Sequence, residues 1–227
     1  MERKIAFVPG EHYHVFSRGV EKRKIFQERR DYLRFLALLY ILNQKEQFHL
    51  SNFLKRDKRK VDDVFEKKRD SQLVSILAYS LMPNHFHLLI RENEEGGISK
   101  FMGKLLTAYS MYFNIKNERS GPLFVRPFRS SHAENDTHFR HLFSYIHLNC
   151  LDLHQSSWKS AGIADRNSAD RFLNQYRYSS YPYFVNSATF PEHKILDQLA
   201  IPDFVSRAPL RTEDFEGWYA EELEVLS

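Results

Sequence analysis

Residues 81–90 read LMPNHFHLLI, a Pro-Asn turn signal followed by an apolar run that is interrupted by two histidines. Side chains two positions apart in a strand point to the same side, so His85 and His87 share one face. The preceding residues 73–80, LVSILAYS, have the pattern of a buried strand. The sequence therefore predicts a hairpin that carries a pair of metal-capable imidazoles on its second arm.

The segments around this hairpin follow a regular order of strands and helices. They are a strand at 11–19, a helix at 31–44, the strands at 73–80 and 85–92, a helix at 96–122 and a strand at 124–133. This order is that of a ferredoxin-like fold, an α+β architecture with a four-stranded antiparallel sheet and two helices on one face. We expect this catalytic domain to span residues 5–150.

An additional helix is predicted over residues 135–151, with Asn135 or Asp136 as its N-cap. Its buried stripe includes Phe139 and Cys150, and a polar stripe lies on the neighbouring face. The polar stripe consists of His138, His141, Tyr145 and Asn149. If the helix packs against the sheet, this stripe can face the histidine pair.

Charge is divided unevenly along the 227-residue chain. Residues 1–150 contain 26 Lys and Arg against 17 Asp and Glu, net +9, whereas residues 151–227 contain 7 against 12, net −5. A basic domain is typical of a nucleic-acid-binding protein. We expect residues 151–227 to form a helical, aromatic-rich extension, whose acidic end faces away from the site or shields it.

Composition also excludes several classes of protein. A hydrophobic content of 42% with 15% aromatic residues indicates a folded chain. The single cysteine, Cys150, excludes an internal disulfide and a cysteine-based zinc site. No signal peptide or membrane-spanning run is recognisable, so we expect a cytoplasmic protein without membrane contact.

A divalent metal bound by His85 and His87 needs a third, harder ligand and open positions for substrate oxygens. The amide oxygen of Asn149 can supply that ligand, and Tyr145 lies one helical turn before it on the same face. A phenol beside a metal-bound phosphate can act as a nucleophile on a phosphodiester. The alternative is that both histidines are ordinary strand residues with hydrogen-bonded rings.

Several motifs together resemble the single-tyrosine HUH transposases and, within them, the REP-associated tyrosine transposases. These motifs are YHVFSRG, LMPNHFHLLI, YSMYFN, RSGPLF and YIHLN, in this order within residues 5–150. The resemblance implies that His85, His87 and Asn149 bind Mg or Mn and that Tyr145 is the nucleophile. It further implies cleavage of single-stranded DNA next to a hairpin through a 5′-phosphotyrosine intermediate, and DNA transposition by strand transfer. Cys150 stands where the family usually has proline.

Other residues can contact DNA or compete for these roles. Four arginines near strand ends and turns are candidates for phosphate contacts, with solvated surface as the alternative. They are Arg18, Arg119, Arg126 and Arg129. His12 and His14 form a second H-x-H pair, for which packing or a phosphate contact is the favoured interpretation. Tyr109 and Tyr112 belong to an apolar helix stripe, which favours core packing.

Two other functions stay open at this point. One is a domesticated protein that binds hairpin DNA or RNA without cutting it. The other is a metal-dependent phosphodiesterase that uses water and does not need Tyr145. By its resemblance to REP-associated members, we expect a monomer rather than a homodimer.

Overall fold

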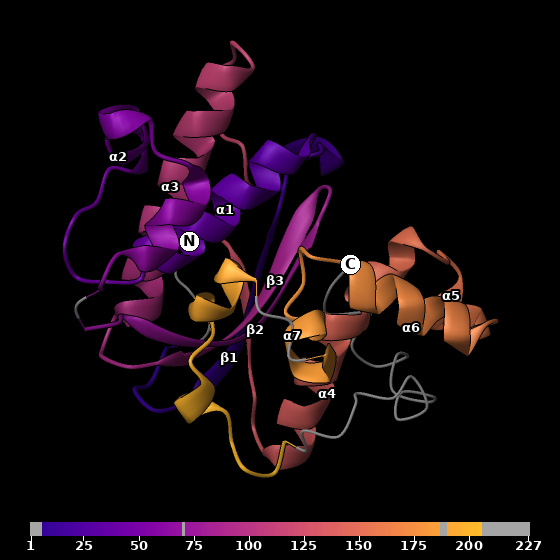
Figure 1. Cartoon of the computed structure of the whole chain (residues 1–227). Helices are drawn as coiled ribbons and strands as arrows, with labels where there is room; N and C mark the ends of the chain where they lie inside the picture. Colours follow the sequence, from indigo (N-terminus) through magenta and orange to yellow (C-terminus); the bar gives the residue numbers. More distant parts are fainter. Residues whose placement is uncertain (1–5, 70, 187–189, 206–227) are drawn as a thin grey trace.

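The computed structural model describes residues 6–69, 71–186 and 190–205 (Figure 1). The acidic end of the chain, residues 212–227, lies outside the described residues. One four-stranded sheet has the order β2-β3-β1-β4, with every neighbouring pair antiparallel. Its strands are β1 (His12–Arg18), β2 (Val74–Met82), β3 (His85–Glu92) and β4 (Arg129–His132). The predicted ferredoxin-like α+β fold is confirmed.

Helices cover both faces of this sheet (Figure 1). They are α1 (Arg29–Ile41), α2 (Leu50–Lys55), α3 (Gly97–Lys116), α4 (Asp136–Leu148), α5 (Trp158–Ala161), α6 (Arg166–Gln175) and α7 (Tyr181–Asn186). α1 and α3 lie on one face, and α4 is the added helix on the other face. No helix in the described part of the chain combines the length and the apolar character that a membrane span needs.

The alternation of side chains along the strands divides the core into two layers. Val15 and Leu88 point toward α1 and α3, where they join the main apolar cluster. Leu89, the neighbour of Leu88, packs instead with Phe139 and Ile146 of α4. His87 is two residues from Leu89 and therefore lies on the α4 side of the sheet. The period-two pattern of β3 thus places the histidines between the sheet and α4.

Several elements are shorter than the sequence predicts; the helix expected over 135–151 continues after Leu148 as a 3-10 helix. The strand expected over 124–133 is regular only at β4, because Pro127 has no backbone N–H to donate to the sheet. The helix expected over 96–122 ends at Lys116, five residues before Gly121, which has a positive φ of 86°.

The charged segment 53–70 is less solvated than its sequence suggests. Its described part, residues 53–69, contains the end of α2 and two short 3-10 helices, η2 (Arg56–Lys58) and η3 (Val61–Glu66). Val64 and Phe65 of η3 are buried in the main core, where η3 packs against α1. Its apolar residues anchor this segment, whereas its cations are exposed except for Arg69, which packs on the Tyr40 ring.

Candidate active site

The β2–β3 hairpin turn is held by the chain that follows β1. Met82 pairs with His85, which leaves Pro83 and Asn84 as the turn. The backbone N–H of Gly19 donates to the Asn84 carbonyl oxygen at 2.8 Å. A Cβ at Gly19 would lie 2.3 Å from the carbonyl oxygen of Arg23, so the site needs a glycine there. This packing fixes the end of β3 at which His85 sits.

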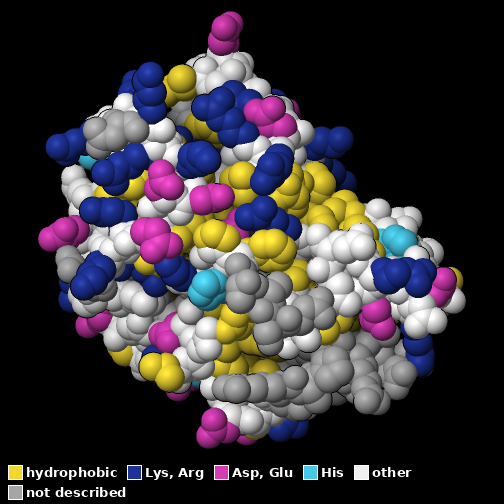
Figure 2. All heavy atoms as spheres, in the orientation of Figure 1, with side chains coloured by type: hydrophobic (Ala, Val, Ile, Leu, Met, Phe, Trp, Pro, Cys, Tyr) yellow, Lys and Arg dark blue, Asp and Glu magenta, His cyan; other side chains and the backbone are white. Residues whose placement is uncertain are grey.

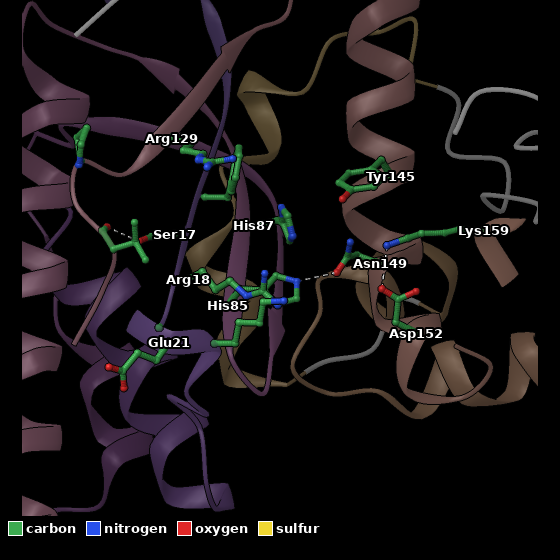
Figure 3. Close-up of a pocket in the computed structure, with 15 residues that line it drawn as sticks. Ser17, Arg18, Glu21, His85, His87, Arg129, Tyr145, Asn149, Asp152 and Lys159 are labelled. Carbon is green, nitrogen blue, oxygen red and sulfur yellow. Dashed lines mark hydrogen bonds and ion pairs between the residues drawn. The ribbon is translucent and has the colours of Figure 1, made fainter. Parts of the chain in front are cut away.

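His85 presents a lone pair to Asn149. The Asn84 amide nitrogen donates to the Lys22 carbonyl oxygen at 3.3 Å, so its oxygen faces His85 Nδ1 at 2.7 Å and accepts that proton. Burial lowers the pKa of His85 to about 4, so the ring is neutral near pH 7. With its one proton on Nδ1, His85 turns an unprotonated Nε2 toward Asn149 Oδ1, 3.2 Å away (Figure 3).

His87 is oriented by a second histidine. His14 lies on β1, and its Nε2 is 2.8 Å from Nδ1 of His87. Both side chains are buried, and burial lowers the pKa of His14 to about 3 and that of His87 well below its usual value. The shared hydrogen bond occupies Nδ1 of His87, which leaves its Nε2 for the cavity.

Tyr145 stands beside these two histidines. It comes from α4, and its ring centroid lies 5.5 Å from that of His87 and 5.9 Å from that of His14. Figure 3 shows the phenol pointing from α4 toward the histidines, with Asn149 one turn further on. Lys159 Nζ is 5.5 Å from the Tyr145 ring centroid and 2.8 Å from Asp152 Oδ2. The phenol therefore lies between an imidazole and an ammonium group.

A cavity of about 420 Å³ joins these groups and opens between the sheet and the start of η4 (Asn149–Leu153). Four cations line it: Arg18, Lys22, Arg129 and Lys159. Its two carboxylates are Glu21 and Asp152. A cavity with this excess of positive charge suits a phosphate-bearing ligand.

The residues fit a divalent metal by their donor atoms. The Nε2 lone pair of His85 and the Asn149 amide oxygen face each other without a proton between them, and a cation can satisfy both. His87 adds a second imidazole nitrogen to the set. Among the described residues, no group of three or more His, Cys, Asp or Glu side chains is placed to hold a metal. The third donor of the predicted set is the amide of Asn149, a residue type that such groups do not include.

The predicted site residues are only partly brought together. His85, His87, Tyr145 and Asn149 line one cavity, as do Arg18 and Arg129. Arg126 is exposed outside it. Arg119 donates to the side chain of Asn114 and to the Pro122 carbonyl oxygen, and so holds the turn after α3.

The competing tyrosines and the second H-x-H pair make contacts within the folded core. Tyr109 is buried and donates to the Ile25 carbonyl oxygen at 2.6 Å, and Tyr112 donates to Asp31 Oδ1 at 2.9 Å. His12 packs edge-on against Phe139 at 5.0 Å. His14 packs as expected, but its bond to His87 was not expected.

Comparison with known proteins points to transposases. Residues 50–149 match the profile of the family described as IS200-like transposases, and this range contains His85, His87, Tyr145 and Asn149. Over these residues the match agrees with the resemblance of the motifs to single-tyrosine transposases. No curated protein matches the chain. A solved structure of a REP-associated tyrosine transposase bound to a REP hairpin is similar over 91% of this chain and 99% of that one, with 14% identity and a TM-score of 0.48.

Proposed function

We propose that the protein cleaves and rejoins single-stranded DNA next to a hairpin, with Tyr145 as the nucleophile. One observation carries this proposal. The Tyr145 phenol, the His85–Asn149 pair and His87 all line the same positively charged cavity. The IS200-like match over the same residues supports a transposase.

The cleavage step makes one bond and breaks another. The Tyr145 hydroxyl gives its proton to water and its oxygen attacks the phosphorus, the bond between phosphorus and the 3′ oxygen breaks, and that oxygen takes a proton from water. The product is a 5′-phosphotyrosine ester, which keeps the phosphodiester energy for rejoining the strand. Attack by a 3′ hydroxyl of another strand reverses the step and completes a strand transfer.

Residues that line the cavity can bind the metal and the phosphate and stabilise charge during this step. We infer that His85, His87 and Asn149 hold Mg²⁺ or Mn²⁺, which when bound polarises the phosphoryl group. Arg18, which pairs across the sheet with His85, can bind a phosphate oxygen next to the scissile bond. Lys159, held by Asp152, can stabilise negative charge that develops on the phenol oxygen.

A covalent adduct is the decisive test. Hairpin oligonucleotides copied from the inverted repeats that flank the gene are labelled at the 3′ end and incubated with the protein and Mn²⁺. We expect the label to stay on the protein in denaturant and the released strand to end in a 3′ hydroxyl. Tyr145→Phe abolishes the adduct with little loss of DNA binding, because it removes only one oxygen.

Controls separate the alternatives. Tyr109→Phe makes the same chemical change at a buried tyrosine outside the cavity and keeps the adduct. His85→Ala and His87→Ala remove cleavage, and Asn149→Ala weakens it less, because water can replace one amide ligand. Wild-type cleavage by Tyr145→Phe would favour a hydrolytic phosphodiesterase, and hairpin binding without any cleavage would favour the non-cutting protein.

A further inference from the structure

A second cavity, of about 860 Å³, lies between α1, α2 and α3, on the helix layer that covers the other face of the sheet from Tyr145. The charged segment 53–70 supplies much of its wall. Its charged lining residues are Arg30, Arg34, Lys55, Arg59, Lys60, Lys116 and a single carboxylate, Asp62. We call this cavity the α1–α3 groove. Lysine and arginine side chains gather over these helices in Figure 2, with fewer acidic ones among them.

Arg34 is the unusual member of this lining. Its side chain is 9% exposed, and its Nε is buried without a hydrogen-bond partner. One Nη donates to Ser51 Oγ at 2.6 Å, and the guanidinium carbon lies 4.8 Å from the Tyr112 ring centroid. No carboxylate among the described residues forms an ion pair with it. A buried charge without a counter-charge is costly, so this position suits an anion.

The charges near Arg34 make the groove still more favourable for an anion. Lys116 is already paired with Glu28 and Asp31, each at 2.7 Å. Arg30, Lys55 and Lys60 are exposed at the rim and form no ion pair with any described residue. Burial lowers the pKa of the Arg34 guanidinium, and the like charge of Arg30 acts in the same direction. The groove therefore holds more positive charge than its own carboxylate can balance.

We propose that the α1–α3 groove is a second DNA contact, in which Arg34 and the rim cations Arg30, Lys55 and Lys60 bind a backbone phosphate of the hairpin substrate. This proposal rests on the proposed function, because it names that substrate as the source of the phosphate. A guanidinium is suited to phosphate oxygens by its fork of N–H donors. Contacts of this kind position the DNA without reading its sequence.

The test measures DNA binding in the presence of a chelator, so that chemistry does not contribute. Hairpin DNA with flanks is titrated with wild-type protein and Arg34→Gln at several salt concentrations, by fluorescence anisotropy. Removal of a charge-assisted hydrogen bond should weaken binding about tenfold. The slope of log affinity against log salt should fall by about one for each phosphate that the variant no longer binds. Arg34→Lys keeps the charge but not the fork of N–H donors, so its DNA affinity should lie between those of wild type and Arg34→Gln.

A rim variant keeps the test valid if Arg34→Gln does not fold. The triple variant Arg30→Gln/Lys55→Gln/Lys60→Gln changes only exposed side chains and should also lower affinity and salt slope. Its matched control is Lys68→Gln/Lys100→Gln/Arg171→Gln, which removes the same charge from exposed residues outside both cavities. A decrease equal to that of the control would overturn the proposal, because only overall charge would then matter.

Shortened oligonucleotides locate the phosphate. If Arg34→Gln still weakens binding of the stem alone, the contact is to the duplex. If the loss of affinity appears only when the flank is present, the contact is to the single strand. Either result supports the proposal. Stabilisation of wild type but not Arg34→Gln by inorganic phosphate, with unchanged DNA affinity, would overturn it. Weaker binding in the groove variants alongside absence of any adduct in wild type would reject the proposed cleavage only.

Discussion

His14 should control metal binding without being a ligand. Its Nε2 lies 2.8 Å from Nδ1 of His87, and when a metal takes the Nε2 lone pair of His87, His14 Nε2 would accept the remaining proton on Nδ1. His14→Phe fills the same buried space but removes that acceptor. The buried Nδ1–H of His87 then has no partner, which costs about 1–3 kcal/mol. The ring can also place its proton on Nε2, where it blocks the ligand position.

We therefore expect His14→Phe to weaken Mn²⁺ binding about 10- to 100-fold, the usual effect of removing an outer partner of a ligand histidine. The assay is a Mn²⁺ titration followed by electron paramagnetic resonance. Nitrogen NMR of the metal-free protein gives a second readout, because it reports directly which His87 nitrogen carries the proton. His14→Gln, whose amide oxygen can accept the same bond, should recover part of the affinity.

The matched control is His12→Phe, two residues earlier on the same face of β1. His12 packs against Phe139, and its Nε2 has no hydrogen-bond partner among the described residues. This change should leave Mn²⁺ affinity unaltered. Wild-type Mn²⁺ affinity in His14→Phe, with the His87 proton still on Nδ1, would refute the reasoning.

Two further predictions concern stability. His14 and His147 are buried and neutral, and burial lowers the pKa of each to about 3. The unfolded chain takes up their protons below about pH 6.5, so stability should fall as pH drops from 6.5 toward 3, by about 2 kcal/mol per histidine at pH 5. Urea unfolding of the metal-free protein at pH 7 and pH 5 measures this, and equal stability at the two values would contradict it. Asn43 exchanges two buried hydrogen bonds with the backbone of Val74, at 2.8 and 3.0 Å. Asn43→Ala should cost about 2–4 kcal/mol in the same assay, whereas exposed Asn52→Ala should cost almost nothing.

The sequence predicts the local parts of this site well. The H-x-H pair lies on one face of a strand because the strand period is two, and Tyr145 and Asn149 share a helix face because they are four residues apart. The order of elements then determines which helix can reach the histidines. Each of these inferences depends on spacing within a single element, which the sequence shows directly.

Contacts between distant segments were not predictable in this way. His14 meets His87 because β1 pairs with β3 in a particular register, with Phe16 opposite His87. Lys159 reaches Tyr145 from beyond the predicted catalytic domain, through a 3-10 helix and a short α5. Arg34 belongs to a helix with a recognisable apolar stripe, but only its contacts with Ser51 of α2 and Tyr112 of α3 show that it is buried. Register and packing of this kind depend on the whole chain.

The extension after residue 150 also seals one edge of the sheet. β2 is an edge strand, and its outer backbone groups bond to residues 178–180 of the extension: the Leu81 N–H donates to the Tyr178 carbonyl oxygen at 2.9 Å, and the Ser180 N–H donates to the Tyr79 carbonyl oxygen at 2.9 Å. Further along the strand, Asp197 N–H donates to the Ile76 carbonyl. An open strand edge invites pairing with another chain, which leads to aggregation. Removal of this part of the extension would therefore leave backbone groups of β2 unpaired and available to a strand of another molecule. By covering the β2 edge, the extension disfavours aggregation through strand pairing.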